Sequence, residues 1–298
     1  MLFHRQKHLL ALLDALGGHV GNLDFQKLLF LYCRESDETG MYDFVPYKFG
    51  GFSFTSYADR RRLIERGLLD NEPAVWKLTE AGKGAARIAP TTRMSMDQFA
   101  RRNAGIRGRA LVAATYRRHP YYAIRSKIAA RVLASDAAAL QAIVDVCPAP
   151  SRPGLCTIGY EGHTLESYLN LLILDGVTQL CDVRRNPLSR KYGFSKRTLS
   201  NACEGVGIRY AHLATLGIAS EERRNLVTQQ DYDVLFAFYE RKHLPQQSKA
   251  LSLIQAWVEA GERVALTCYE RLPQQCHRHC IAKELLRRAG RLFVPKHL

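Results

Sequence analysis

Reactive side chains are concentrated around one short loop near the end of the chain. They are Cys268, Glu270, Cys276, His277 and Arg278. The apolar run 264–267 before them predicts a buried strand, and the residues after them predict a helix. Ligands of parallel sheets bind beyond the carboxyl ends of strands, and helix N-termini attract anions. The spacing therefore predicts a binding or catalytic site at this loop.

Cysteine chemistry is one alternative for this loop. Cys268 at a strand end and Arg278 on a helix resemble the arrangement of phosphatase and rhodanese loops, where a thiolate and a bound anion share one cradle. Nine residues separate them, however, more than in the tight loop of those enzymes. A nucleophilic Cys268 or Cys276 thus stands beside the simpler interpretation as packed apolar side chains. Zinc is disfavoured because the spacing within 268–280 matches no zinc finger, and the sequence requires no metal or cofactor.

Alternating elements must position these residues. Strands are expected at 155–160, 178–184, 208–213, 264–268 and 292–294. Helices are expected at 164–174, 194–205, 232–239, 249–260 and 281–288. Such alternation predicts an α/β fold with a mostly parallel, doubly wound sheet, preceded by a mainly helical domain.

Polar residues follow most of the expected strands and should therefore converge on one edge of the sheet. The expected catalytic residues are Asp182, Glu270, His277 and His212. The residues expected to bind an anion or another ligand are Tyr160, Glu161, Arg184, Ser189 and Arg278. Carboxylates and imidazoles suit general acid–base catalysis, and the arginines suit a phosphate group. Alternatively, Asp182 and Arg184 only pair with neighbours or cap helices.

Several sequence blocks in this half occur in a recognisable order. They are 157–162, 182–189, 194–196, 207–213 with 216–217, and 268–270 before 276–278. Together they resemble the domain-of-unknown-function 488 family over about residues 154–290. This resemblance implies an α/β fold and a shared site built from the blocks, but no established reaction. The loop 218–224 lacks the additional glycines that the resemblance leads us to expect.

The N-terminal half has the pattern of a small helical domain. Helices are expected at 3–16, 24–34 and about 57–66, followed by a strand that leads into a helix at 74–83. A helix ended by Gly67, a short hairpin, and a helix capped by Thr79 resemble the end of a winged-helix domain. The runs 24–30 and 46–50 more specifically resemble the Panacea (SocA-like) domain, over about residues 1–85. That resemblance implies regulation or partner binding.

Positive charge is strongly localised. The chain carries a formal net charge of +15, and residues 87–131 contain eleven lysines and arginines but one acid, Asp97. This composition predicts binding of nucleic acid or another polyanion. The arginines expected to make the contacts are Arg101, Arg102, Arg107, Arg109, Arg117 and Arg118. The alternative is a solvated helix face in a generally basic protein.

Three prolines and a glycine in 147–154 predict a linker. We therefore expect a winged-helix or Panacea-like domain at 1–90, a basic helical segment at 91–146, and an α/β domain at 155–298. The sequence has neither an apolar run of membrane-span length nor a secretory leader, and its eight cysteines form no disulfide framework. These features predict a soluble cytoplasmic protein without a membrane partner.

Two classes of function are consistent with these features. In the first, the chain is a nucleic-acid-associated protein whose α/β domain binds an anion or nucleotide and acts as a hydrolase or transferase. In the second, it is a non-enzymatic regulatory protein. Its N-terminal domain would then bind DNA or a protein partner, while the α/β domain senses a small anionic ligand.

Overall fold

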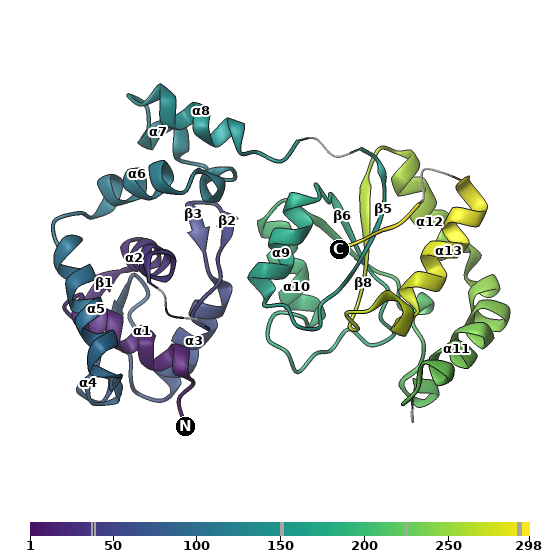
Figure 1. Ribbon diagram of the computed structural model, residues 1–298, viewed down its shortest axis with the longest axis horizontal. Helices are drawn as coiled ribbons and strands as arrows, with labels where there is room; N and C mark the ends of the chain where they lie inside the picture. Colours follow the sequence, from purple (N-terminus) through teal and green to yellow (C-terminus); the bar gives the residue numbers. More distant parts are fainter. Residues whose placement is uncertain (37, 39, 150–151, 224–225, 291–293) are drawn as a thin grey trace. The chain divides into compact units, whose positions relative to one another are not determined.

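The chain forms two compact units. The computed structural model describes residues 1–36, 38, 40–149, 152–223, 226–290 and 294–298. The N-terminal unit is Met1–Cys147 and the C-terminal unit is Pro148–Leu298 (Figure 1). The division falls within the proline-rich segment 147–154. No helix among the described residues has the length and apolar character needed to cross a membrane.

The N-terminal unit is mostly helical. Its helices are α1 (His4–Ala15), α2 (Asn22–Glu35), α3 (Phe54–Glu65), α4 (Glu80–Ala85), α5 (Pro90–Arg102), α6 (Gly108–Arg118), η1 (Pro120–Ala123), α7 (Ala129–Val132) and α8 (Ala137–Asp145). Its strands are β1 (His19–Gly21), β2 (Val45–Tyr47), β3 (Gly50–Phe52) and β4 (Val75–Lys77). β1 pairs with β4 and β2 pairs with β3, both antiparallel.

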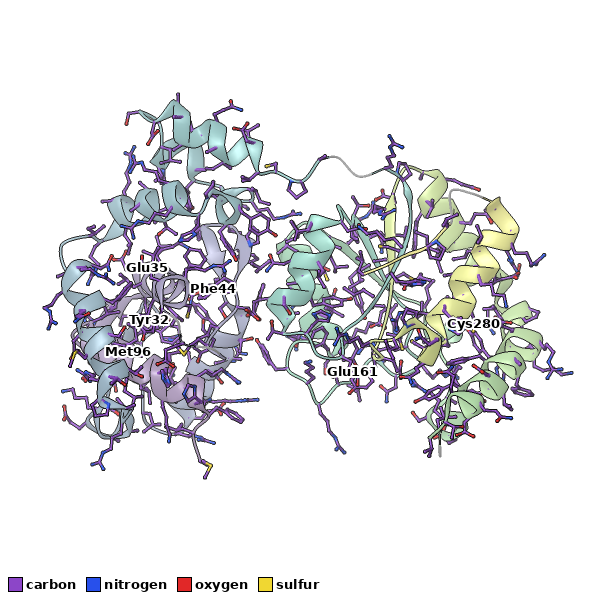
Figure 2. The ribbon with its side chains drawn as sticks, viewed as in Figure 1. Tyr32, Glu35, Phe44, Met96, Glu161 and Cys280 are labelled. Carbon is purple, nitrogen blue, oxygen red and sulfur yellow. The ribbon has the colours of Figure 1, made fainter. Side chains whose placement is uncertain are left out.

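Helix α2 lies at the centre of the hydrophobic core of this unit. Apolar residues occupy more than one of its faces, so most of the helix is buried among its neighbours. Figure 2 shows Tyr32 of α2 and Met96 of α5 in the interior between helices, where both are almost fully buried. Strand β1, which the sequence analysis did not predict, places Val20 opposite the buried Trp76 of β4.

The segment around β4 also holds α3 and α4 together. Thr79 caps α4, as predicted, because its side chain accepts a hydrogen bond of 3.0 Å from the backbone N–H of Gly82. A Cβ atom added to Gly82 would lie 2.0 Å from the carbonyl oxygen of Leu68, so α4 packs here without a side chain. Leu69 forms an isolated bridge with Leu78, so both this segment and β1 pair with the β4 region.

The C-terminal unit is an α/β domain, as the sequence predicted. Its helices are α9 (Leu165–Leu174), α10 (Lys196–Gly205), α11 (Gln229–Phe238), α12 (Ser248–Glu259) and α13 (Arg278–Ala289), with short helices η2 (Ala214–Leu216), η3 (Ser220–Arg223), η4 (Tyr239–His243), η5 (Leu244–Gln247) and η6 (Pro273–Gln275). Its strands are β5 (Gly154–Gly159), β6 (Gln179–Asp182), β7 (Arg209–His212), β8 (Arg263–Cys268) and β9 (Lys296–His297).

These strands form one parallel sheet in the order β7-β6-β8-β5-β9. Helices α9 and α10 cover one face, and α12 and α13 cover the other (Figure 1). The last strand expected from the sequence, 292–294, lies outside the described residues except for Val294. Thr164 caps α9, as predicted, by accepting a hydrogen bond of 3.0 Å from the backbone N–H of Ser167.

Candidate functional site

The carboxyl ends of the central strands bring the predicted residues onto one edge, which we call the rim. Asp182 at the end of β6 is in register with His212 of β7 and with Thr267 of β8. Cys268 at the end of β8 is in register with Gly159 of β5. The rim contains two clusters of polar side chains, one around Asp182 and one around Cys268.

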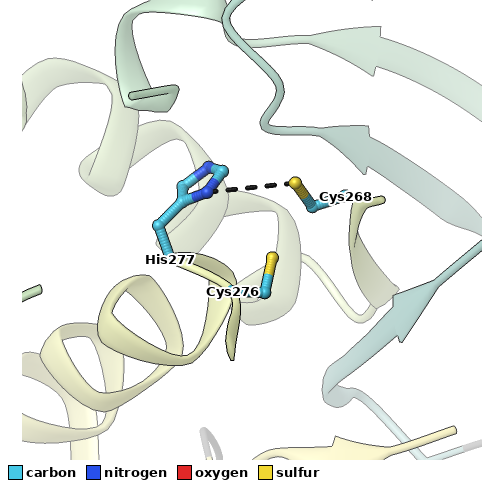
Figure 3. A group of neighbouring side chains, drawn as sticks. All are labelled: Cys268, Cys276 and His277. Atoms are coloured by element: carbon cyan, nitrogen blue, oxygen red, sulfur yellow. Dashed lines mark hydrogen bonds between the residues drawn. The ribbon is translucent and has the colours of Figure 1, made fainter. Parts of the chain in front are cut away.

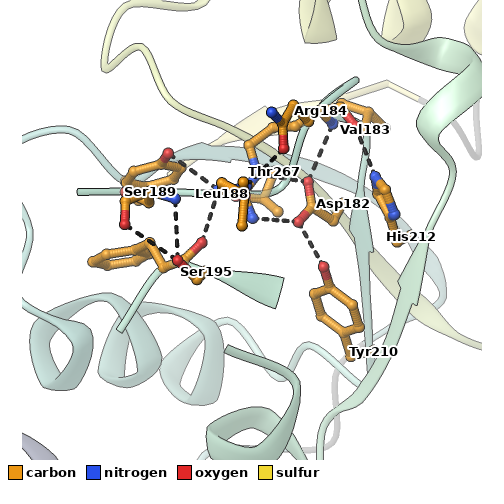
Figure 4. Close-up of polar contacts among 12 residues, drawn as sticks. Asp182, Val183, Arg184, Leu188, Ser189, Ser195, Tyr210, His212 and Thr267 are labelled. Carbon is orange, nitrogen blue, oxygen red and sulfur yellow. Dashed lines mark hydrogen bonds and ion pairs between the residues drawn. The ribbon is translucent and has the colours of Figure 1, made fainter. Parts of the chain in front are cut away.

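Asp182 is the centre of a buried ion pair (Figure 4). Arg184 donates to both carboxylate oxygens, from Nε at 2.8 Å and from Nη2 at 2.5 Å. Tyr210 Oη donates at 2.6 Å, and burial together with the Asp182 charge raises the pKa of Tyr210. The tyrosine therefore stays a neutral donor. Both carboxylate oxygens of Asp182 are thus occupied by protein donors.

Arg184 joins three segments of the unit. Besides Asp182, its Nη1 donates to Tyr160 Oη at 3.1 Å and to the carbonyl oxygen of Phe194 at 2.8 Å. The rings of Tyr160 and Phe194 are stacked, with centroids 4.4 Å apart and planes at 9°. Because the guanidinium group is buried and occupied, it has little donor capacity left. Its role as an anion ligand remains a prediction that these contacts do not favour.

Two histidines hold the backbone that follows β6. His277 Nε2 lies 3.0 Å from the carbonyl oxygen of Val183, and His212 Nε2 lies 2.8 Å from that of Arg184. A carbonyl oxygen can only accept, so each Nε2 carries the hydrogen. In the neutral rings, both Nδ1 atoms therefore retain a lone pair.

The second cluster places a thiol beside one of these lone pairs (Figure 3). Cys268 Sγ lies 3.9 Å from His277 Nδ1 and 3.4 Å from Glu270 Oε2. A hydrogen bond from Cys276 and the positive charge of Arg223 lower the pKa of the Cys268 thiol to about 7, despite its burial. Burial raises the pKa of Cys276 to about 12. Cys268 is therefore the more acidic of the two thiols.

Arg278 braces the loop that follows β8. This buried guanidinium donates to the carbonyl oxygens of Glu270 at 2.5 Å and Arg271 at 2.9 Å. The Glu270 carboxylate forms an ion pair with Arg223 of η3. The loop packs closely on β5, because a Cβ added to Gly159 would lie 1.9 Å from the Glu270 carbonyl oxygen. The predicted role of Arg278 as an anion ligand is therefore not favoured by its contacts and remains a prediction.

The two other predicted ligand residues organise loops at the rim. The Glu161 carboxylate accepts a hydrogen bond of 2.9 Å from the backbone N–H of Arg271. Ser189 is bound through its backbone, because its N–H and its carbonyl oxygen contact Ser195 Oγ at 3.1 and 3.2 Å. The Ser189 loop also carries the exposed Arg190. Binding of a ligand by Glu161 or Ser189 remains a prediction.

Three residues of these clusters were missed by the sequence analysis. Tyr210 had a usable signal, because it lies two positions before His212 and so shares a strand face with it. Phe194 contributes its backbone carbonyl and a stacked ring, which no motif reveals. Arg223 reaches Glu270 from a segment 47 residues away in sequence, and nothing in the spacing of the two residues indicates it.

Among the described residues of the C-terminal unit, two groups have donor atoms close enough together to hold a metal ion. Cys268, Cys276 and His277 place theirs within 4.8 Å of one another, and so do Glu240, His279 and Cys280. Thiolate and imidazole donors are those that Zn²⁺ prefers. The expectation that the chain needs no metal remains a prediction.

In the N-terminal unit, part of the predicted polyanion surface is neutralised locally. Arg102 and Arg118 lie 3.7 and 2.9 Å from the Glu35 carboxylate, and Arg117 lies 2.6 Å from that of Asp136. Two more of the six predicted arginines donate to backbone carbonyl oxygens. Exposed ion pairs of this kind are weak, so polyanion binding remains a prediction.

A parallel sheet with polar residues at its carboxyl edge defines the C-terminal unit as an α/β domain, and doubly wound folds bind their ligands at this edge. Residues 164–285 match the family described as domain of unknown function DUF488, so this segment is a DUF488 domain. That part of the sequence resemblance is confirmed. No curated protein and no solved structure matches the chain. None of these comparisons supports the winged-helix or Panacea resemblance, which remains a prediction.

Proposed function

We propose that the C-terminal unit is a hydrolase or transferase that acts on phosphate esters, such as those of nucleotides or nucleic acid, through a thiolate on Cys268. One observation carries this proposal: Cys268 Sγ faces His277 Nδ1 at 3.9 Å while His277 Nε2 is 3.0 Å from the Val183 carbonyl oxygen. A nucleophile, a base and a group that orients the base are thus arranged in order.

The proposed reaction has two steps. His277 Nδ1 takes the thiol proton, and Cys268 Sγ bonds to phosphorus while the bond from phosphorus to the ester oxygen breaks. The leaving oxygen receives the proton from the His277 imidazolium. Water then attacks the phosphocysteine, which restores the thiolate and releases phosphate. In a transferase, an acceptor hydroxyl replaces this water.

Charges near the thiol support an anionic substrate. Arg223 is the partly exposed cation of the Cys268 cluster, through its ion pair with Glu270. The loop after β6 adds the exposed cations Arg185 and Arg190. Because Cys268 is only 1% exposed, we propose that a substrate phosphate displaces the Glu270 carboxylate from Arg223 as it approaches the sulfur.

The thiol is favoured over the carboxylates that the sequence analysis placed first. Asp182 is fully buried and occupied by Arg184 and Tyr210. Glu270 is paired with Arg223. Proposed catalysis by either acid would require that these contacts break, whereas His277 Nδ1 already faces the thiol.

Turnover and trapping test this proposal. Purified protein is incubated with para-nitrophenyl phosphate and with bis(para-nitrophenyl) phosphate, and nitrophenolate release is followed. Cys268→Ser should lower the rate by about 10³-fold or more, and His277→Gln should lower it strongly as well. Acid quenching followed by peptide mass spectrometry should reveal a phosphoryl group on Cys268. Cys147→Ser, which changes an exposed cysteine of the other unit, is the matched control.

Alkylation gives a test that is independent of substrate choice. The rate at which iodoacetamide modifies Cys268 should rise with pH around 7, and Arg223→Ala should shift this rise to higher pH, because it removes a positive charge that lowers the pKa of the thiol. His277→Gln should slow the modification in either background. Equal modification rates for Cys268 with and without His277, together with turnover that survives Cys268→Ser, would contradict the proposal.

We propose a second function for the N-terminal unit, namely binding of nucleic acid or another polyanion. The order α1, β1, α2, α3, with paired segments at Leu69 and β4, resembles that of a winged-helix domain, although the β2–β3 hairpin lies between α2 and α3. Helix α3, the third helix in this order, exposes Arg61 and Arg62. If the C-terminal unit proves inactive, this observation favours the regulatory alternative, with a DNA or protein partner and a small anionic ligand at the rim.

Salt dependence tests this second function. Binding of a fluorescent DNA duplex should weaken steeply as salt rises, because each neutralised phosphate releases counterions. Arg61→Ala with Arg62→Ala should reduce the slope if α3 contacts DNA, and Arg101→Ala with Arg102→Ala should reduce it if α5 does. Affinity that does not change with salt would exclude a polyanion partner.

A further inference from the structure

We infer that the N-terminal unit binds a divalent transition-metal ion through His4, His8 and Glu38. Donor atoms of the three side chains all lie within 4.8 Å of one another. His4 and His8 are one turn apart on α1, so they share a helix face. Glu38 comes from the segment after α2. The inference is independent of the proposed thiol chemistry, which concerns the other unit.

The orientation of His8 suits a metal ligand. Its Nδ1 donates to the carbonyl oxygen of His4 at 2.9 Å, which leaves the lone pair of the neutral ring on Nε2. Metal-binding histidines generally donate their other ring N–H to a carbonyl or carboxylate in this way. The ring is 4% exposed, so its orientation is also held by packing.

Glu38 places a carboxylate oxygen, a second potential metal ligand, opposite this lone pair. Its Oε2 lies 3.7 Å from His8 Nε2, too far for a hydrogen bond between them. The other oxygen, Oε1, accepts a hydrogen bond of 2.7 Å from Thr92 Oγ1 of α5, which fixes the carboxylate. Zn²⁺ lies about 2.0–2.2 Å from nitrogen and oxygen ligands, so one ion between the two atoms spans this gap with little movement.

A cavity beside the three residues leaves room for a further ligand of the metal. Its volume is about 550 Å³, and its wall includes Lys7 and Arg87 as well as the three ligands.

Three protein ligands leave at least one coordination position of a tetrahedral ion free. The cations Lys7 and Arg87 in the wall favour an anion, such as a carboxylate or phosphate, as the ligand at that position. Imidazole and carboxylate donors together favour Zn²⁺, Co²⁺ or Ni²⁺ over Mg²⁺ or Ca²⁺.

Cobalt titration of the full chain tests the inference. Co²⁺ bound by histidine and glutamate gives weak d–d bands, whereas Co²⁺ bound by cysteine adds an intense thiolate charge-transfer band. The titration therefore separates this site from the cysteine-containing groups of the other unit. We expect one Co²⁺ ion with d–d bands and no charge-transfer band, and displacement of that ion by Zn²⁺.

Variants decide whether these residues are the ligands. His4→Ala, which changes an exposed side chain, and Glu38→Gln should each weaken Co²⁺ binding at least about tenfold, and Thr92→Val should weaken it by about tenfold. His19→Ala, an exposed histidine on β1, should leave it unchanged. Circular dichroism confirms that each variant is folded. The inference is overturned if the d–d bands are absent, or if they persist unchanged in both His4→Ala and Glu38→Gln.

Discussion

The buried amine of Lys27 gives a prediction whose sign and size follow from the structure. Lys27 on α2 is 2% exposed and donates a hydrogen bond of 3.0 Å to the carbonyl oxygen of Gly51. Burial lowers the pKa of this amine from 10.5 to about 7. Because the folded pKa lies below the unfolded one, the unfolded chain binds more protons between these values. Stability should therefore rise with pH in this window.

The perturbation is Lys27→Met, which removes the titrating group but keeps an unbranched side chain. The difference between 10.5 and about 7 corresponds to on the order of 5 kcal/mol of destabilisation, present in full below pH 7. Loss of the hydrogen bond to Gly51 offsets about 1–3 kcal/mol of the gain. The variant should thus be more stable than the unaltered protein at pH 6, and this advantage should shrink by about 3 kcal/mol at pH 9.

Urea unfolding at pH 6 and pH 9 measures this change. In a Trp257→Phe background, fluorescence reports on Trp76, the remaining tryptophan, which is buried in the N-terminal unit. Lys48→Met, at an exposed lysine of the β2–β3 turn, is the control and should show no pH-dependent difference. An advantage of Lys27→Met that is equal at the two pH values, within about 0.5 kcal/mol, would refute the reasoning.

Three further predictions concern the C-terminal unit, and urea unfolding checks each of them. Tyr210→Phe should destabilise the unit by about 1.5–3 kcal/mol, because it removes a hydrogen bond to the buried charge of Asp182. Gly217→Ala should destabilise more than a typical surface change, since the added Cβ would lie 2.0 Å from the backbone nitrogen of Arg185; a difference below about 0.5 kcal/mol would contradict this close approach. Thr164→Ala should cost about 1 kcal/mol through loss of the α9 cap, whereas Thr164→Ser should cost little.

The sequence predicted the C-terminal fold well because its signals are local and repeated. Apolar runs of strand length alternate with helical patterns, and caps such as Thr164 mark where helices begin. The parallel sheet then requires strand ends to share an edge, which correctly brought Asp182, His212 and Cys268 together. By contrast, β1 and β9 have three and two residues, too short for a periodic signal.

Contacts between distant segments set the limit of prediction at the site. The sequence identified Arg184 and Arg278 as cations at the rim, and both lie there. It could not show that their donors point to protein acceptors, because these acceptors include backbone carbonyls of Phe194 and Arg271. Backbone oxygens are present at every position, so only the folded geometry selects which ones are used.

The donor and acceptor atoms at the rim differ in how fully protein partners occupy them. Asp182, Arg184 and Arg278 are buried and bound to protein partners, so they stabilise the loops around the site. The histidines also hold backbone, but each through Nε2 alone, and their Nδ1 atoms retain lone pairs. One of these lone pairs faces Cys268. If the rim carries out a reaction, the groups least committed to holding the fold are therefore this thiol and its imidazole, rather than the charged residues that first draw attention in the sequence.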